Sequence, residues 1–461
     1  MLPSGVVAGD LGQENCFGPA LEKIRNASGR AGFQVVSLPS EKTVCEHESA
    51  LPLVPASLVK VLTSFGALKT LGPQFRFKTD VFATQEPKDG IIHGDVLIRG
   101  AGDPYLFTDN ARELARQVAK TGVRRIEGSI EVDSSFFEPA AERLCLDGKC
   151  EAGYNPVISA AALDFNTLSV RVIPAAKPGK PARVEWYPAG DYVRIAGSVN
   201  TVRKNAASSV SVREGESAGD GRERVLVSGR VPARPERTFE YRVNVHDPAV
   251  MVGGAFKWML KEAGVQVLGG VKAGKVPEGA VKLAVHESVP LSDFLHGLNR
   301  FSNNFMAEML LRSVGGYVLG PPCTAEKGVA ALKPILRQAG APEQEADLDC
   351  GSGLSRICRV TPATFAKVLT AVYLDSSISS DFWNSLAVSG HEGTLRNRRY
   401  GPGIRVNGKT GTLSDVVGFA GYVSGPSGNL SAVCVILNDV RDRWKARQAI
   451  DSLIEQVALS N

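Results

Sequence analysis

The sequence predicts a multi-domain α/β protein whose first and last segments belong to one domain. The length of 461 residues corresponds to two or three domains at about 150 residues each. Helix and strand patterns alternate towards both ends of the chain, whereas a long central stretch has strand patterns alone. The central part is therefore expected to be an insertion into a domain built from the two ends.

The composition narrows the class of protein. Hydrophobic residues make up 43% of the chain and charged residues 22%, which is the balance of a globular protein. The net charge of +5 comes from scattered basic residues without aromatic residues between them, which argues against nucleic-acid binding. No run approaches the ~20 apolar residues of a membrane span. Residues 1–15 lack the basic and apolar regions of a signal peptide, so we expect a cytosolic protein or the mature form of an exported one.

The first elements are predicted to be a helix, a strand and a second helix. Leu21 and Ile24 share one face of a short helix that ends near Gly29, and residues 33–38 are rich in β-forming side chains. A strong helix begins at Pro55, because proline suits the first turn of a helix. It ends at residues 72–73, a Gly-Pro pair.

The middle of the chain is predicted to hold two different modules. Residues 91–100, 110–122 and 127–135 follow the order strand, amphipathic helix, strand, which is typical of a βαβ unit. Residues 168–245 show no helical period and alternate short β-rich runs with turn residues. They are expected to form a small all-β domain.

The carboxyl-terminal part returns to mixed structure. Helices are predicted at residues 249–263 and 291–314, and three strands follow at 403–413, 416–424 and 429–439. A last helix carries Ile450, Leu453, Ile454 and Val457 on one face. The three strands are expected to form an antiparallel meander within the domain that the two chain ends share.

The cysteines favour an oxidising compartment. Cys145 and Cys150, and Cys350 and Cys358, have spacings that suit short disulfide loops. Neither pair has a second CxxC or a HxxxH to complete a zinc site, and no metal is expected. Cys434 lies in an apolar run and is expected to be a buried free thiol.

Several familiar catalytic motifs are either missing from the sequence or stand in an unsuitable secondary-structure element. None of the six histidines lies in a HExxH, and there is no GxSxG elbow, so neither a zinc hydrolase nor a serine-histidine triad is supported. Residues 403–410 match the phosphate loop GxxxxGK[ST], but they continue into β pattern instead of the helix that binds phosphate. Residues 100–104, GAGDP, lack the third glycine of a dinucleotide site and are expected to form a turn.

The strongest candidate for a nucleophile is Ser57 in Ser57-Leu-Val-Lys60. Ser57 is predicted to lie in the first turn of a helix, where free backbone N–H groups favour a developing anion. Residues i and i+3 share a helix face, so the Lys60 amine can lie beside the Ser57 hydroxyl. A desolvated lysine can then remove the hydroxyl proton.

Two further short patterns supply neighbours for Lys60. Ser302-Asn-Asn304 stands at the junction of two predicted helices, and Lys409-Thr410-Gly411-Thr412 stands on a predicted strand. The alternative for the first is an ordinary helix cap. Decoys at residues 198–200 and 120–122 repeat the Ser-x-Asn and Lys-Thr-Gly spacings, but only the set containing Ser57, Ser302 and Lys409 has each pattern in a suitable element.

This set resembles the Ser-x-x-Lys, Ser-x-Asn and Lys-Thr-Gly motifs of penicillin-binding proteins and serine β-lactamases. With residues 55–82, 298–312, GSGLSR at 351–356 and HEGTLRNR at 391–398, the chain resembles the low-molecular-mass class C penicillin-binding proteins. Those are D-alanyl-D-alanine carboxypeptidases and endopeptidases. The resemblance implies a transpeptidase-like domain with an antiparallel central sheet flanked by helices (1–80 and 289–461). An α/β-type domain (81–167 and 246–288) and a small all-β domain (168–245) would interrupt it.

The resemblance also implies roles for individual residues. Ser57 would be the acylated nucleophile and Lys60 its general base, and Ser302 would relay a proton to the leaving group. Asn304 would bind the substrate backbone, while Lys409 would set the electrostatics. From its place on a strand alone, Gly411 is expected to let the substrate backbone approach closely. Thr410 and Thr412 would hold the terminal carboxylate of the substrate. Arg356 and Tyr154 would contact the donor side chain.

These implications set the expected partners and leave alternatives open. The expected ligands are the D-Ala-D-Ala stem peptides of peptidoglycan and β-lactam antibiotics, without a cofactor, and the expected location is the periplasm or another exported site. A homodimer is left open, as is the preference for carboxypeptidase or endopeptidase activity. The rival functions are a serine β-lactamase and a penicillin sensor or scaffold with little turnover.

Overall fold

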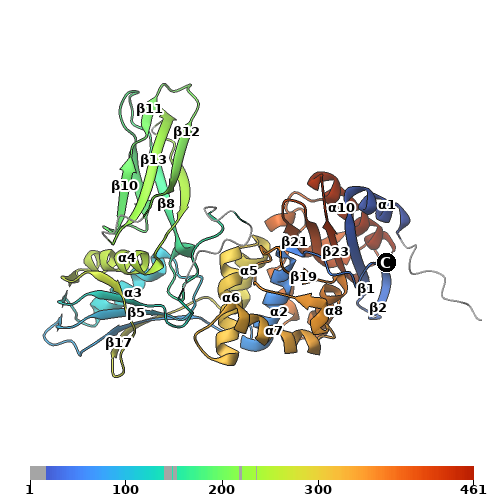
Figure 1. Cartoon of the computed structure of the whole chain (residues 1–461), viewed down its shortest axis with the longest axis horizontal. Coiled ribbons are helices and arrows are strands. Elements are labelled where there is room, and N and C mark those ends of the chain that lie inside the picture. The colour runs from blue at the N-terminus through green and yellow to red at the C-terminus, as the bar shows by residue number, and fades with distance from the viewer. Residues whose placement is uncertain (1–16, 140–147, 149–152, 217–220, 235, 461) are drawn as a thin grey trace, which may run out of the picture. The chain divides into compact units, whose positions relative to one another are not determined.

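The computed structural model divides the chain into two compact units (Figure 1). It describes residues 17–139, 148, 153–216, 221–234 and 236–460. Unit 1 comprises Met1–Phe75, Pro290–Val318 and Ala325–Asn461, and unit 2 comprises Arg76–Val289 and Leu319–Thr324. Over the described residues, no helix has the length and apolar character that crossing a membrane requires.

Unit 1 is built around an antiparallel six-stranded sheet in the order β2-β1-β23-β22-β21-β20. Strand β1 pairs with β23 from Arg30–Asn438 to Ser37–Ser431, so the two ends of the chain share one sheet. The three carboxyl-terminal strands form the meander that the sequence predicted. The strands are β1 Arg30–Ser37, β2 Lys42–His47, β20 Ala387–Val388, β21 Arg405–Thr412, β22 Val417–Ser424 and β23 Leu430–Asn438.

Helices cover both faces of this sheet (Figure 1). On one face, Leu21 and Ile24 of α1 (Gly18–Ala27) pack with Ile450, Leu453 and Val457 of α10 (Arg443–Ser460) in one apolar cluster. The other face carries the helices that hold the candidate site. They are α2 Val59–Leu71, α5 Leu291–Arg300, α6 Asn304–Leu319, α7 Ala325–Gln338, α8 Pro362–Leu374 and α9 Ser379–Ser385, with the short pair β18 Ala346–Asp347 and β19 Arg359–Val360.

Unit 2 contains the predicted βαβ unit. Strands β5 (Val96–Gly100) and β7 (Ile130–Asp133) pair in parallel, and α3 (Thr108–Lys120) connects them. They belong to a five-stranded sheet in the order β16-β7-β5-β3-β17, covered by α4 (Pro248–Glu262), while β4, β6 and β15 form a small second sheet. The remaining bounds are β3 Lys78–Ala83, β4 Ile91–Ile92, β6 Arg125–Ile126, β15 Gln266–Val267, β16 Val271–Ala273 and β17 Val281–Glu287.

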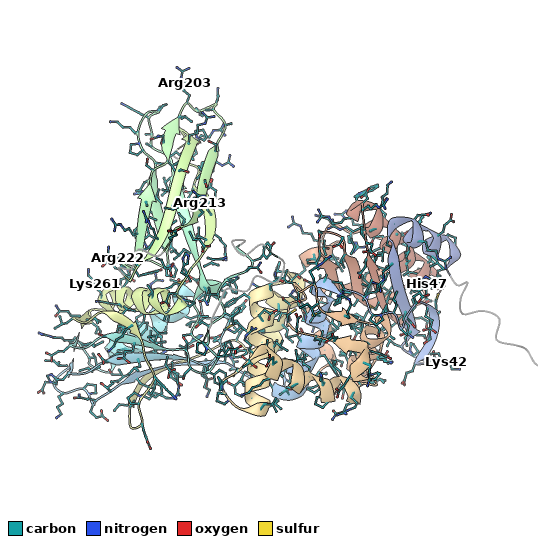
Figure 2. The ribbon with its side chains drawn as sticks, in the orientation of Figure 1. Lys42, His47, Arg203, Arg213, Arg222 and Lys261 are labelled. Carbon is teal, nitrogen blue, oxygen red and sulfur yellow. The ribbon has the colours of Figure 1, made fainter. Side chains whose placement is uncertain are left out.

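The stretch without helical period folds into two further small sheets of unit 2. One has the order β10-β13-β11 with β12 on β13, and the other has the order β14-β8-β9. Arg203, Arg213 and Arg222 lie at separate levels along this part instead of gathering in one patch (Figure 2). The strands are β8 Thr167–Ile173, β9 Arg183–Tyr187, β10 Val193–Gly197, β11 Asn200–Val202, β12 Ser209–Glu214, β13 Glu223–Pro232 and β14 Phe239–Asn244.

The helix predicted from Pro55 differs from the observed one at its start. Residues Ala56–Leu58 form a turn of 3₁₀ helix, and the α-helix α2 begins only at Val59. Ala56 has φ 50°, in the left-handed region that alanine rarely adopts. Such strain concentrates at functional sites, and here it lies directly before Ser57.

Candidate active site

The candidate nucleophile lies on the short 3₁₀ turn that leads into α2. Its neighbours Ala56 and Leu58 are fully buried, so the core fixes the turn on both sides of Ser57. Gly353 packs directly on this turn with φ 76°, and a Cβ there would lie 1.8 Å from the Ala56 carbonyl oxygen. Only glycine fits at this contact.

Lys60 lies one turn further along and points back at Ser57. The Lys60 Nζ donates to Ser57 Oγ at 3.0 Å, to Asn304 Oδ1 at 2.8 Å and to the Ser352 carbonyl oxygen at 2.7 Å. The side chain is fully buried. Burial lowers the pKa of Lys60 to about 7, although the negative charge of Glu308 acts in the opposite direction. A large fraction of Lys60 is therefore neutral near neutral pH.

The neutral form of Lys60 has its lone pair in a defined direction. A neutral amine keeps two N–H groups, and two of its three neighbours, the Asn304 amide oxygen and the Ser352 carbonyl oxygen, can only accept. Ser57 alone among the three can donate. The lone pair of neutral Lys60 must therefore face the Ser57 hydroxyl, which is the arrangement of a general base and its nucleophile.

Ser302 and Asn304 lie at the junction of α5 and α6. Ser302 has φ 58°, which turns the chain sharply between the two helices. The helix cap is provided by the residue between them, because Asn303 Oδ1 accepts from the Met306 N–H at 3.0 Å. The side chains of Ser302 and Asn304 are thus available for the site, and the alternative that they serve as an ordinary cap is wrong.

Lys409 supplies a second buried amine. It lies on β21, and its Nζ donates to Ser302 Oγ and to the Thr410 carbonyl oxygen, both at 2.8 Å. Burial, and then the charge of Lys60, lowers the pKa of Lys409 well below its ordinary value. The three sequence patterns therefore form two hydrogen-bonded groups, Lys60 with Ser57 and Asn304, and Lys409 with Ser302.

The rest of the Lys-Thr-Gly-Thr segment forms an open strand edge. Strand β20 pairs with β21 only at Asn407 and Gly408, so among the described strands none pairs with that edge over residues 409–412. Thr410 is half-buried with its hydroxyl donating to Thr394 Oγ1 at 2.8 Å, and Thr412 is exposed. Such an edge can accept an extended peptide.

Gly411 packs against the turn that carries the candidate nucleophile. A Cβ on Gly411 would lie 2.9 Å from the Pro55 carbonyl oxygen and 3.2 Å from Leu58 Cγ. The missing side chain therefore lets β21 pack against the turn that carries Ser57, because side chains alternate along a strand and residue 411 faces inward. That Gly411 also lets the substrate backbone approach along the free edge of the strand stays a prediction.

The comparisons with known proteins agree with this geometry. Residues 20–457 match the D-Ala-D-Ala carboxypeptidase 3 (S13) family. The chain belongs to this family. It is 32% identical over 434 residues to a D-alanyl-D-alanine carboxypeptidase of Actinomadura sp. (strain R39), covering 90% of this chain and 78% of that protein. This family match confirms the enzyme class predicted from the three motifs, a serine-type D-Ala-D-Ala carboxypeptidase.

Solved structures confirm the fold class of this S13 family member. The crystal structure of penicillin binding protein 4 from Haemophilus influenzae aligns with a TM-score of 0.80 at 23% identity, covering 96% of this chain and 99% of that one. A structure of the same H. influenzae protein in complex with a β-lactam aligns with a TM-score of 0.77, at the same identity and coverage.

The resemblance implies that two further residues, Arg356 and Tyr154, contact the donor side chain of the substrate. Arg356 is held by a two-pronged ion pair with Asp415, at 2.6 and 2.7 Å, and this pairing raises the pKa of Arg356 and lowers that of Asp415. Tyr154 lies in unit 2 and is exposed. Its contact with a substrate stays a prediction.

Two residues that touch the site were missed by the sequence reasoning. The Ser352 carbonyl binds Lys60, and a backbone carbonyl leaves no signature in a sequence. Glu308 is 1% exposed, and its Oε1 accepts from the Ser352 N–H at 2.9 Å while Oε2 accepts from Arg312 Nη1 at 3.0 Å. Its position four residues after Asn304, on the same helix face, was the signal that could have identified it.

The expected disulfide between Cys350 and Cys358 is absent from the structure. Both are free thiols, with their sulfurs 3.6 Å apart, where a disulfide needs about 2.05 Å. The other expected pair, Cys145 and Cys150, lies outside the described residues. Cys434 is a buried free thiol, as predicted.

Proposed function

We propose that Ser57 attacks the bond between the last two D-alanines of a peptidoglycan stem peptide and is acylated by it. The observation that carries this proposal is the set of contacts around Lys60, two partners that only accept and one hydroxyl, in a site where its pKa is about 7. General bases work best when their pKa lies near the operating pH. In the first step, neutral Lys60 takes the Ser57 proton while Ser57 Oγ bonds to the peptide carbonyl carbon.

The open edge of β21 provides the place for the substrate. An extended peptide can hydrogen-bond to the free edge over residues 409–412. The hydroxyls of Thr410 and Thr412 would bind the terminal carboxylate, and Lys409 in its protonated form adds positive charge behind them. The backbone N–H groups of Ser57 and Thr412 are the proposed oxyanion hole, whose donors stabilise charge that develops only in the transition state.

The second buried pair is suited to the leaving group. Ser302 Oγ accepts from Lys409 Nζ at 2.8 Å, so a proton given up by Ser302 can be replaced by Lys409. We assign Ser302 as the donor to the departing D-alanine amine. Water then hydrolyses the acyl-enzyme, which regenerates Ser57 and releases the shortened stem peptide.

Carboxypeptidase and endopeptidase activities follow the same steps. In an endopeptidase the leaving amine belongs to a neighbouring stem peptide, and cleavage opens a cross-link. β-Lactams are expected to acylate Ser57 in the same way, and the complex of the H. influenzae relative with a β-lactam supports this. Peptidoglycan lies outside the inner membrane, so we place the enzyme in the periplasm or an equivalent exported site.

The proposal is tested by covalent labelling followed by intact-protein mass spectrometry. Wild-type protein should gain one penicillin adduct on Ser57, Ser57→Ala should gain none, and Lys60→Ala should label on the order of 10²- to 10⁴-fold more slowly because it lacks the base. Lys69→Ala is the matched control, since Lys69 lies on the same helix and pairs with Asp375 at the surface. Labelling of Ser57→Ala at the wild-type rate would refute the assignment.

The lifetime of the adduct separates the proposal from its rivals. A class A serine β-lactamase uses a glutamate carboxylate to direct the deacylating water. Both oxygens of Glu308, the buried carboxylate whose charge acts on Lys60, are already engaged by Ser352 and Arg312. The adduct should therefore persist. Rapid return of free enzyme with excess hydrolysed penicillin would favour a β-lactamase, and a lasting adduct without release of D-alanine from a D-Ala-D-Ala peptide would favour a sensor.

A further inference from the structure

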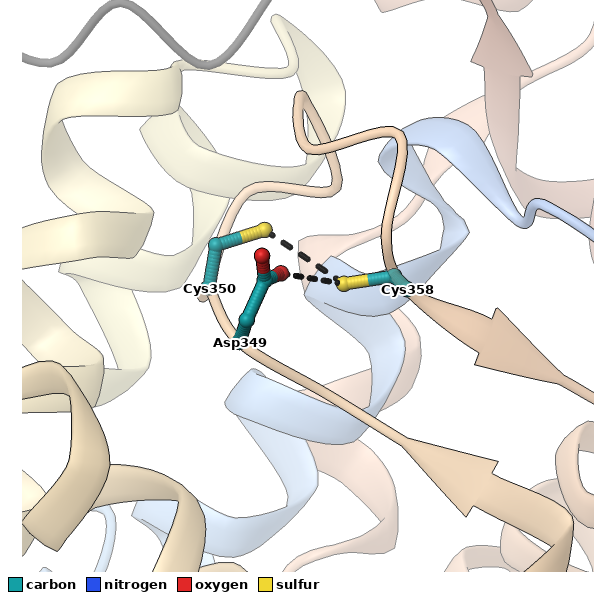
Figure 3. A group of neighbouring side chains, drawn as sticks. All are labelled: Asp349, Cys350 and Cys358. Carbon is teal, nitrogen blue, oxygen red and sulfur yellow. Dashed lines mark hydrogen bonds between the residues drawn. The ribbon is translucent and has the colours of Figure 1, made fainter.

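Two buried thiols face each other beside the active site. Cys350 and Cys358 lie at the two ends of the loop 350–358, with Sγ atoms 3.6 Å apart (Figure 3). The Cys358 thiol also donates to Asp349 Oδ1 at 2.9 Å, and the Gly353 N–H donates to Cys350 Sγ at 3.3 Å. The two sulfurs converge from opposite sides of the loop base, as the figure shows.

The loop between these thiols is part of the catalytic site. Its Ser352 carbonyl accepts from Lys60 Nζ at 2.7 Å, and Gly353 packs on the Ala56 carbonyl of the nucleophile turn. Further along, Arg356 pairs with Asp415. A change at the base of this loop is therefore transmitted to the group that orients Lys60.

We propose that Cys350 and Cys358 are an oxidisable pair whose disulfide closes the base of this loop and holds Ser352 against Lys60. The bond is a modification of the chain that does not depend on the proposed function. Its effect on acylation rests on the proposed function of Ser57.

The oxidation balances with a disulfide as the oxidant. The two thiols lose two protons and two electrons, one S–S bond forms through a mixed disulfide, and the disulfide of a thiol–disulfide oxidoreductase is reduced to two thiols. The sulfurs must approach from 3.6 Å to about 2.05 Å. The hydrogen bond from Cys358 to Asp349 is lost, but Asp349 keeps a donor, because Ser355 Oγ lies 2.5 Å from its Oδ2.

The two redox states should each persist once the protein has folded. Cys350 is 2% exposed and Cys358 is fully buried, so an oxidant has little access to either sulfur. The hydrogen bond to Cys350, together with burial, raises the pKa of Cys358, and a protonated thiol exchanges slowly. The bond is therefore expected to form during folding, before the loop is buried. Cys45 is disulfide-bonded in this structure, which fits folding in an oxidising compartment.

The experiment compares protein folded under oxidising and reducing conditions. Peptide mapping without reductant should find Cys350 joined to Cys358 in the first sample and two thiols in the second. The oxidised protein should acylate with penicillin faster, by about threefold to tenfold, because small displacements of a catalytic group cost rate. It should also unfold at a higher temperature, since the bond constrains the unfolded chain.

A double variant, Cys350→Ser with Cys358→Ser, controls for disulfides elsewhere in the chain. It retains Cys45, Cys145 and Cys150, so any response of this variant to reductant measures the contribution of the cysteines outside the loop. Cys434→Ser, which removes a buried thiol elsewhere in the same unit, should respond to oxidation like the wild type.

Three results would overturn the proposal. The first is a pair that stays as thiols after oxidative folding. The second is oxidised and reduced forms that label equally and unfold at the same temperature. The third is a pair that binds one equivalent of Zn²⁺ through Asp349 and both sulfurs, because the cluster would then be a metal site. If the disulfide forms and raises the unfolding temperature, but penicillin labels neither the oxidised nor the reduced protein, the proposed function is refuted and the disulfide is established.

Discussion

Replacing Glu308 by glutamine should change the pH at which the enzyme becomes active. Glu308 is buried on α6, and its charge raises the pKa of Lys60 against the larger effect of burial. Glutamine has nearly the same shape, and its amide oxygen can still accept the Ser352 N–H. The substitution therefore removes the charge and preserves the hydrogen bond that positions the Ser352 loop.

The size of the effect follows from the path between the two groups. Glu308 reaches Lys60 through one residue, because it binds the N–H of Ser352 and Lys60 binds its carbonyl. Unit charges roughly 7 Å apart at an effective dielectric constant of about 20 interact by about 2 kcal/mol. Arg312, which is paired with Glu308, offsets part of this, so we expect the pKa of Lys60 to fall by about one unit.

The sign of the pH effect is determined by the role of Lys60. The base must be neutral, so acylation increases as pH rises through the pKa of Lys60, about 7 in the wild type. A pKa lower by about one unit moves this midpoint to lower pH, and at pH 6 the neutral fraction rises about fivefold. At pH 9 both proteins are neutral at Lys60, and the variant should be about threefold slower because its base is weaker.

The assay is the second-order rate constant for acylation by a fluorescent penicillin between pH 5 and pH 9. Arg312→Met should shift the midpoint the other way, since it removes the cation that offsets Glu308. Glu345→Gln is the matched control, because that carboxylate pairs with Lys367 and not with the site. Shifts of the same sign in Glu308→Gln and Arg312→Met, or no shift in either, would refute the electrostatic reasoning.

Three further predictions concern the packing of the site, a buried acid and the inserted module. Gly411→Val should slow acylation at least about tenfold and lower stability by about 1–3 kcal/mol, because its side chain would meet the Pro55 carbonyl and Leu58; native rates and an unchanged melting temperature would contradict this. Burial raises the pKa of Asp103 to about 7, above its unfolded value of about 3.9, so the wild type should lose stability as pH rises from 4 to 7. Asp103→Asn should therefore be more stable at pH 8 by at most about 4 kcal/mol and equal to the wild type at pH 4, and thermal unfolding at the two pH values checks this; a gap of equal size at both would count against it. Replacing residues 168–245 by a short linker should leave acylation of Ser57 largely intact while altering activity on polymeric peptidoglycan. The two ends of the deletion lie near each other, since the retained Thr167 pairs with Asn244, two residues before the retained residue 246; loss of labelling in a folded deletion protein would exclude it.

The sequence by itself determined the elements that have strong local signals. The apolar faces of α1, α2 and α10, the β-rich runs of the terminal meander and the Gly-Pro end of α2 depend on side-chain periodicity and turn residues, which are local properties of a chain. The three catalytic motifs were identified in the same way, because each needs only a short spacing on one element. Even the decoy Lys-Thr-Gly at residues 120–122 could be set aside locally, since it lies at the end of α3.

Tertiary structure decided how the motifs combine. Lys60 and Asn304 are 244 positions apart in the chain, and no local pattern predicts that the amine of Lys60 donates to the amide oxygen of Asn304. The fold also decided that Gly411 packs on the nucleophile turn, that Asn303 provides the helix cap, and that Cys350 and Cys358 meet as thiols. Burial acts in the same way, because the pKa of Lys60 depends on desolvation and on Glu308, and both exist only after distant segments have come together. The identity of the catalytic residues is thus local information, whereas their reactivity is a property of the folded core.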